Sequence, residues 1–295
     1  MRPGPLRAHM KIKNIRTPLS RLILATMTFG IVLFPLTNSV AAQFSKSVTR
    51  MTTFVGGDIH TLTLTKSGLF VTGHEGGSYS TDEGMKWKSV PSFTNTDIMG
   101  WATTSSGYLA GGHNGLYRST NGGKSFKRFN FYGNTSDVHA LGADKKTVYM
   151  GSPQVGFLRS VDGGKSWKVV NKKIGQGFMG SMLVDVKNPL RVIAPDMQNG
   201  IVETLDGGKT WARFGGPSGP MSIDWSKKDP RKIIALGMGG GAITKDNGNT
   251  WSTFSVPLGS GALAFSATGS RILIATLVGK RALILKSDDD GKHWS

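Results

Sequence analysis

Cysteine is absent from the 295-residue chain, and glutamate occurs only as Glu75, Glu83 and Glu203. Without cysteine the protein cannot form a disulfide scaffold, a thiolate zinc site or a cysteine nucleophile. Glutamate is among the commonest residues on exposed helix faces, so its scarcity argues against a protein of long helices. The 41 glycines and the hydrophobic share of 38% argue against both a disordered chain and a collagen-like one.

The first 42 residues have the three-part pattern of a secretory signal peptide. Six basic residues and no acidic one precede an apolar run over residues 22–36, and small residues follow at 40–42. A membrane anchor is the weaker alternative, because the run contains Pro35 and is shorter than the roughly 20 residues of a membrane span. We therefore expect residues 1–42 to be removed and the protein to be exported, to the periplasm or outside the cell, without remaining in the membrane. Translation could begin at Met1 or at Met10.

A short motif recurs along the rest of the chain. Its third position is Asp or Asn, a Gly follows two residues later, and an aromatic residue ends it. The third position recurs after 39, 41, 44, 40 and 43 residues. The six copies are Ser80–Trp87 around Asp82, Ser119–Phe126 around Asn121, Ser160–Trp167 around Asp162, Thr204–Trp211 around Asp206, Thr244–Trp251 around Asp246 and Ser287–Trp294 around Asp289. Six matches at one spacing predict a repeat architecture.

Each copy has the residues of a hairpin turn. Asp or Asn accepts local backbone hydrogen bonds, and the glycine after it takes positive φ. An apolar strand such as residues 68–72 precedes the turn, and an alternating strand such as residues 60–64 precedes that one. Each unit therefore predicts four short antiparallel strands, and six such units predict an all-β, six-bladed β-propeller over residues 43–295.

The motif resembles the Asp-box, or BNR, repeat of a β-propeller superfamily that includes sialidases, sortilin-type receptors, xyloglucanases and photosystem II assembly factors. Five copies meet the pattern S/T-x-D-x-G-x-x-W, and the second departs from it at Asn121 and Phe126. The resemblance covers the whole chain after the leader. It implies the propeller fold and a structural role for the box residues. Small secreted bacterial members are often described as glycosyl hydrolases, but the motif itself lies far from the active centre in that superfamily.

The last copy ends one residue before the end of the sequence, so the sixth blade lacks its outermost strand. The segment Lys46–Phe54 has a strand pattern with no other assignment. We expect it to supply that strand and to close the ring, which removes exposed sheet edges. The alternative is that the sequence is a fragment of a longer protein.

Lysine recurs once in most copies of the motif, at Lys86, Lys124, Lys165, Lys209 and Lys292. The formal net charge is +18, and removal of the six leader bases leaves 30 Lys and Arg against 18 Asp and Glu, or +12. This spacing distributes the charge around the propeller, so we expect no nucleic-acid partner. A basic rim suits attraction to an anionic surface of the cell envelope, or solubility alone.

Histidine and methionine gather at one face of the predicted propeller. The starts of the innermost strands align His60, Met99, His139, Met179, Met221 and Leu263 at one position around the ring. The loops between the second and third strands open on the same face and contain His74, His113, Met197 and Met238. Four of the five histidines after the leader therefore lie on this face, where the central channel opens.

This gathering leaves three interpretations open. Imidazole and thioether are the ligands that copper prefers when thiolate is absent. The first interpretation is thus a non-enzymatic metal-binding module, with copper as the candidate metal and His60, His74, Met99, His113, His139, Met179 and Met221 as the candidate ligands. The second is packing alone, because His60 has the side-chain parity of Leu62 and Leu64 and methionine is ordinary core filler. The third is a pocket for an organic ligand at the channel mouth.

Three carboxylates suggest a different class of function. Asp58, Asp97 and Asp137 each lie two residues before the ring position, and paired carboxylates are what glycoside hydrolysis requires. Glu75 is the only glutamate free to face the channel. The alternatives are a sialidase-like hydrolase that uses these acids, aspartates that merely cap the loop entering each strand, and a docking scaffold of the assembly-factor kind.

Overall fold

The computed structural model describes residues 53–133 and 137–295. The predicted signal peptide, residues 1–42, and most of the segment Lys46–Phe54 lie outside these residues. Among the described residues no helix has the length and apolar character needed to cross a bilayer. The one helix described is a 3₁₀ turn, η1 (Pro91–Phe93), and the remaining elements are strands.

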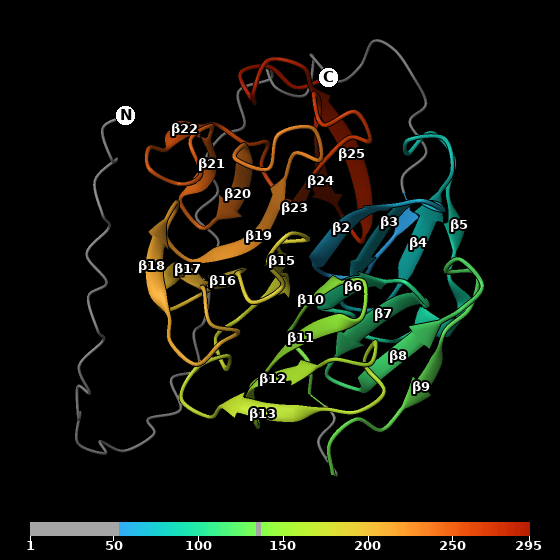
Figure 1. The fold of residues 1–295 in the computed structure, drawn as a ribbon. Coiled ribbons are helices and arrows are strands. Elements are labelled where there is room, and N and C mark those ends of the chain that lie inside the picture. Colours follow the sequence, from blue (N-terminus) through green and yellow to red (C-terminus); the bar gives the residue numbers. More distant parts are fainter. Residues whose placement is uncertain (1–52, 134–136) are drawn as a thin grey trace, which may run out of the picture. The chain divides into compact units, whose positions relative to one another are not determined.

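Six sheets stand around a common centre, which confirms the predicted all-β, six-bladed propeller (Figure 1). In blades 1–5 four successive strands run from the inside of the ring to the outside as antiparallel neighbours. Blade 1 comprises β2 (Ile59–Thr65), β3 (Gly68–Gly73), β4 (Gly77–Ser80) and β5 (Lys88–Ser89). Blade 2 comprises β6 (Gly100–Thr104), β7 (Gly107–Gly112), β8 (Gly115–Ser119) and β9 (Lys127–Phe129). Blade 3 comprises β10 (Ala140–Asp144), β11 (Thr147–Ser152), β12 (Gly156–Ser160) and β13 (Lys168–Asn171).

The second half of the ring repeats this plan. Blade 4 comprises β15 (Leu183–Val184), β16 (Val192–Asp196), β17 (Gly200–Thr204) and β18 (Ala212–Gly215). Blade 5 comprises β19 (Pro220–Trp225), β20 (Ile233–Gly237), β21 (Gly240–Thr244) and β22 (Ser252–Phe254). Blade 6 comprises β23 (Ser260–Phe265), β24 (Ile272–Val278) and β25 (Arg281–Ser287), with β1 (Thr53–Phe54) as its outermost strand.

The two ends of the propeller meet in blade 6, as the sequence predicts. Strand β1 pairs antiparallel with β25, with Thr53 opposite Ala282 and Phe54 opposite Arg281. The N–H groups of Val55 and Gly56 extend the contact by donating to the carbonyl of Lys280. This pairing covers the edge of β25, which would otherwise be exposed.

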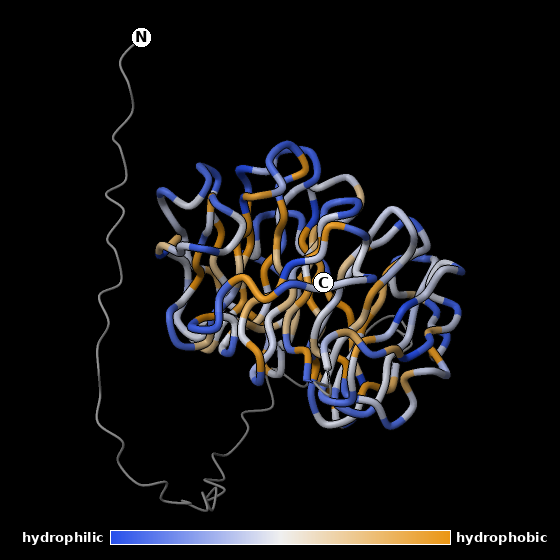
Figure 2. The backbone as a smooth tube through the Cα atoms, turned by 60° about the horizontal axis from the view of Figure 1, so that its bottom comes forward, coloured by the Kyte–Doolittle hydropathy of each residue, from blue (hydrophilic) through white to orange (hydrophobic). Residues whose placement is uncertain are grey.

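The hydrophobic core lies between blades rather than at a single centre. Six clusters of buried side chains occur among the described residues, and each draws on two neighbouring sheets. Between blades 1 and 2, for example, Phe70 packs against Trp101 with ring centroids 4.8 Å apart. Figure 2 shows the hydrophobic stretches within the strands and the hydrophilic ones in the turns. Full burial of one Phe or Leu side chain in these clusters stabilises the fold by roughly 1.5–3 kcal/mol.

The six Asp-box segments form one recurring turn. In the first, the Ser80 hydroxyl donates to Asp82 Oδ1 and accepts from the N–H of Gly84, and Asp82 Oδ1 also accepts from the N–H of Lys86. The turn glycine has positive φ and no room for a side chain. A Cβ on Gly123 would lie 2.3 Å from Phe70 of blade 1, and one on Gly208 would lie 2.1 Å from Phe157 of blade 3. Each box therefore packs its glycine on the preceding blade, which explains why the motif needs glycine there.

Blade 4 departs from the predicted plan at its inner strand. The segment β14 (Gly180–Ser181) leaves the blade and pairs parallel with β10, which gives the blade 3 sheet a fifth strand. Gly180, at a φ of +65°, donates its N–H to the carbonyl of His139, and Met182 donates to that of Leu141. Gly142 permits this approach, because a Cβ there would lie 2.6 Å from the Met182 carbonyl. A local bend at Gly180 therefore adds this segment to the blade 3 sheet, while blade 4 keeps four strands.

The ring position of blade 6 also differs from the sequence alignment. Strand β2 has a register shift at His60, β19 has one at Met221, and β23 has one at Gly261. Gly261, not Leu263, is thus equivalent to His60, and Leu263 is a core residue only 1% exposed. The sequence alignment places Leu263 at this position instead, because residues two apart in a strand lie on the same face and the hydrophobic pattern cannot distinguish them.

Candidate metal centre

Four histidines and two aspartates converge on one face at blades 1–3. They come from different elements, which the propeller repeat places side by side. His60 lies on β2, His74 in the β3–β4 loop and His113 in the β7–β8 loop. Asp97 precedes β6, and Asp137 and His139 precede β10. The sequence predicts all six as site residues, His60, His74, His113 and His139 as metal ligands and the two aspartates as catalytic acids.

Backbone geometry turns the first of these side chains toward the channel end of the blade. His60 is the extra residue at the bulge between β2 and β3, where Ile59 pairs with Gly73 and Thr61 with Thr72. A bulge leaves its residue outside the ladder and re-aims the side chain. His60 is therefore only 11% exposed at its side chain, yet it does not join the column of Leu62 in the core.

Asp97 is the hub of the cluster. Its side chain is 8% exposed, and three imidazoles surround it. Its Oδ1 lies 3.0 Å from His60 Nε2, while its Oδ2 lies 3.6 Å from His74 Nδ1 and 3.4 Å from His113 Nε2. Both oxygens of Asp97 and the Nε2 of His60 are buried without a hydrogen bond of acceptable geometry. A buried carboxylate in this state is costly unless a positive charge compensates it.

Asp137 forms a second group with His113 and His139. Its Oδ1 lies 3.0 Å from His113 Nδ1 and 3.0 Å from His139 Nε2. His113 therefore lies between the two aspartates, with one ring nitrogen toward each. Burial lowers the pKa of His139, the carboxylate of Asp137 raises it and the neighbouring His113 lowers it again, and the net change is downward. The lower pKa favours the neutral imidazole of His139, which has a lone pair to offer.

The six side chains make two sets of three ligand atoms. In each set, His60 with His74 and Asp97, or His113 with Asp137 and His139, the atoms lie within 4.8 Å of one another. Asp97 is buried and His60, Asp137 and His139 are half-buried, whereas the side chains of His74 and His113 are 58% and 48% exposed. Solvent therefore reaches the cluster over these two histidines, and either set could hold a divalent cation with a coordination position left open.

Two of the other candidate residues, Asp58 and Glu75, have partners outside the cluster. Asp58 is exposed, and its Oδ1 accepts from the N–H of Ile59 at 2.7 Å, as expected of a strand cap. Glu75 pairs with Lys280, with Oε2 and Nζ 3.2 Å apart. Met99 is buried, whereas Met179 and Met221 are half-buried. A catalytic role for Asp58, Asp97, Asp137 or Glu75 stays a prediction, as does a ligand role for the methionines.

Comparisons with known proteins support the fold. No protein-family model and no curated protein matches the sequence. Among solved structures, the GH74 enzyme of Niastella koreensis is similar with a TM-score of 0.56 and 14% identity, over 82% of this chain and 54% of that one. The GH74 xyloglucanase of Xanthomonas campestris gives a TM-score of 0.56 and 18% identity, over 83% and 46%. YCF48 of Cyanidioschyzon merolae gives a TM-score of 0.49 and 17% identity, over 84% and 86%.

The two GH74 structures share the β-propeller architecture of this chain. The chain spans about half the length of the two GH74 structures it matches. Identities of 14% and 18% show a shared β-propeller and leave the chemistry of this chain to its own residues.

Proposed function

We propose that this protein binds a divalent transition-metal ion, Cu²⁺ or Zn²⁺, through the histidines and aspartates of blades 1–3. The supporting observation is the environment of Asp97. Both of its oxygens are buried and lack hydrogen bonds, and the polar groups facing them are ring nitrogens of His60, His74 and His113. The lone pairs of a carboxylate and of neutral imidazoles repel one another unless a shared cation or protons lie between them.

The distances from Asp97 to its neighbouring imidazoles are close to those between ligands of one metal ion. Ligand atoms about 2.0–2.2 Å from a tetrahedral metal lie roughly 3.3–3.5 Å from each other. The distances from Asp97 to the three imidazoles are 3.0, 3.6 and 3.4 Å. In the set His60, His74 and Asp97 all ligand atoms lie within 4.8 Å of one another, so the side chains must move closer together to bind an ion.

Charge also favours a dication. Asp97 and Asp137 contribute two negative charges, and each has only histidines among its ion-pair partners in the described residues. With neutral imidazoles the cluster has a charge of −2, which one divalent ion neutralises. Imidazole with carboxylate suits Zn²⁺ and Cu²⁺, whereas Cu⁺ favours thioether and thiolate. The donor set therefore shifts the sequence-based proposal of a His and Met copper site toward a divalent ion.

The propeller would then be a metal-dependent binding module at the channel mouth. Three protein ligands leave a position for water or for an oxygen or nitrogen atom of a ligand. If the leader directs export, as its pattern predicts, the module acts in the periplasm or outside the cell. His74 and His113, the two exposed ligands, are the residues that an incoming ligand would meet first.

Titration calorimetry with Zn²⁺ and Cu²⁺ tests this proposal. We expect the purified protein to bind at least one ion stoichiometrically, and Asp97→Asn to weaken binding by more than about 100-fold. Asp58→Asn is the matched control, because it makes the same change at an exposed strand cap and should leave the affinity unaltered. The proposal fails if the wild type binds neither ion, or if the two variants bind equally.

A further inference from the structure

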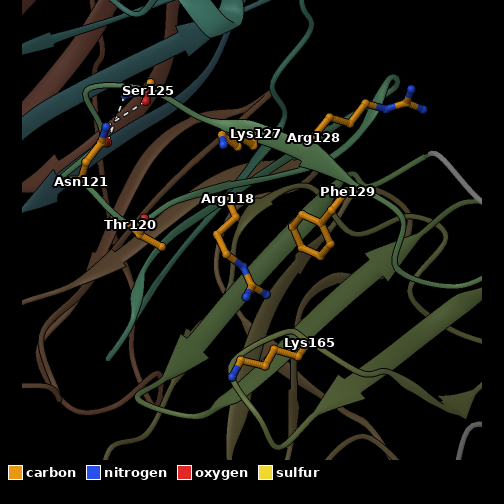
Figure 3. Close-up of a pocket in the computed structure, with 8 residues that line it drawn as sticks. All are labelled: Arg118, Thr120, Asn121, Ser125, Lys127, Arg128, Phe129 and Lys165. Carbon is orange, nitrogen blue, oxygen red and sulfur yellow. Dashed lines mark hydrogen bonds between the residues drawn. The ribbon is translucent and has the colours of Figure 1, made fainter.

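A second candidate site lies between blades 2 and 3, on elements that the histidine cluster does not use. It is an open pocket of about 490 Å³ beside the second Asp-box segment. Its lining residues are Arg118, Thr120, Asn121, Ser125, Lys127, Arg128, Phe129 and Lys165 (Figure 3). Four of these eight are cationic and none is acidic. The volume is in the range of small-molecule sites.

No carboxylate of the described residues lies within ion-pair distance of these four cations. Arg118 is instead held by neutral groups. Its guanidinium lies 4.8 Å from the centre of the Phe129 ring, and its Nη2 donates to the carbonyl of Gly163 at 3.3 Å. Its Nε is buried without a partner. Figure 3 shows the guanidinium between the Phe129 ring and Lys165. The pocket is thus a concentration of positive charge that no described anion neutralises.

The second Asp-box segment differs from the other five at this place. Asn121 Oδ1 accepts from the Ser119 hydroxyl at 2.9 Å and from the N–H of Ser125 at 3.1 Å. In the third segment, Asp162 accepts the same two bonds from Ser160 and Ser166. The amide therefore keeps the turn while it removes the negative charge that the other five copies have. The one box with a neutral residue at its third position thus lies beside a pocket that contains four cations.

We infer that this pocket binds a small molecule with a phosphate or sulfate group. Arg118 and Lys165 would contact the oxyanion from opposite sides, because they come from neighbouring blades. The Ser125 and Thr120 hydroxyls supply neutral donors at the rim. Arginine with lysine and hydroxyl donors is the usual composition of an oxyanion site. This inference is independent of the metal proposal, since it shares no residue with it.

The charge of residue 121 gives a direct test. We expect wild-type protein to bind glucose 6-phosphate or inorganic sulfate saturably, measured by calorimetry at fixed ionic strength, and not to bind glucose. The two anions distinguish a phosphate ester from a free oxyanion. Asn121→Asp should weaken binding by about tenfold, because it places a negative charge, which repels the anionic ligand, in the pocket. The turn should survive, since Asp occupies this position in five copies. Asp246→Asn, the reverse exchange in blade 5, should leave the affinity unchanged.

A second set of variants tests the pocket without changing residue 121 of the Asp-box turn. Lys127 and Lys165 are exposed, so their replacement by alanine should not affect folding. We expect Lys127→Ala with Lys165→Ala to weaken binding by more than about tenfold, whereas Lys209→Ala, at the equivalent box position in blade 4, has no effect. The inference is overturned if the wild type binds neither anion saturably, or if the Lys209 variant loses as much affinity as the pocket variant.

Discussion

The Nε2 atom of His60 lies 3.0 Å from Oδ1 of Asp97, and both atoms are buried without a well-aligned hydrogen bond. A shared cation could satisfy both of these atoms. This relationship joins blade 1 to blade 2 at the channel mouth, and it is the basis of the metal proposal.

Thermal stability should respond to metal. An ion that binds only the folded protein stabilises it by about 2.7 kcal/mol at a free concentration 100 times its Kd. For a domain of this size that corresponds to a rise in Tm of roughly 5–10 °C. Calorimetric melting with and without Zn²⁺ measures the rise, and excess chelator should reverse it. A double variant, His60→Ala with His139→Ala, should show no rise; an unchanged rise would exclude these ligands.

Replacing Asp206 by Ala or by Asn should lower the free energy of unfolding by different amounts. Its carboxylate accepts from the N–H groups of Lys209 and Thr210 and from two threonine hydroxyls. Asp206→Ala removes these acceptors and should cost roughly 1–2 kcal/mol of unfolding free energy. Asp206→Asn should cost less, because Asn121 forms the same turn with an amide. Urea unfolding of the two variants is the measurement, and equal losses would contradict the role assigned to the side chain.

Gly180 should tolerate no side chain. It has a φ of +65°, and a Cβ would lie 2.7 Å from the Met221 carbonyl. Gly279 has a φ of +63°, and a Cβ there would have no atom within 4 Å, so this position isolates backbone strain from the clash. We expect Gly279→Ala to cost about 1 kcal/mol and Gly180→Ala clearly more. Similar losses in chemical denaturation would mean that Gly180 does not pack against the Met221 carbonyl as the structure places it.

Asp224 predicts a pH dependence of stability. Burial raises its pKa to about 6, against the lowering effects of the N–H groups of Phe265 and Trp225 and the charge of Lys227. The folded protein therefore holds this proton more tightly than the unfolded chain, whose Asp titrates near about 4. The contribution favours folding below about pH 4 and is lost as the pH rises through about 6. Melting curves from about pH 4 to 7 should show this loss, and Asp224→Asn should remove it. An identical slope in the variant would exclude Asp224 as its source.

The fold could be predicted because its determinants are local and repeated. Each Asp-box turn specifies a hairpin through its own hydrogen bonds, so six copies specify six sheets. The closure of blade 6 by Thr53 and Phe54 followed from the count of strands. The shift of β14 did not, because it depends on a bend at Gly180 and on space at Gly142 in another blade. The equivalence of Gly261 with His60 could not be predicted, because a β-bulge does not change the alternation of hydrophobic residues in a recognisable way.

The candidate site could be predicted only in outline. The repeat places His60, His74, His113 and His139 on one face, and that much follows from topology. The central position of Asp97 does not, because it depends on how far each side chain reaches from its strand or loop. Sequence reasoning places Asp97 in a group of catalytic acids, whereas its surroundings in the structure are three imidazoles. For the pocket lined by Arg118 and Lys165, the sequence signal is Asn121, because the other five boxes have a charged Asp at this third position.

Anomalous diffraction from crystals soaked in Zn²⁺, recorded at the zinc edge, tests the central proposal most directly. The account predicts a peak within about 2.0–2.2 Å of an Asp97 oxygen and of His60 Nε2, with His74 or His113 completing the protein ligands. The pair His293 and Asp289, which lies in the last Asp-box segment, is the natural competitor. A peak at that pair alone, or no peak at the blade 1–3 cluster, would contradict the account.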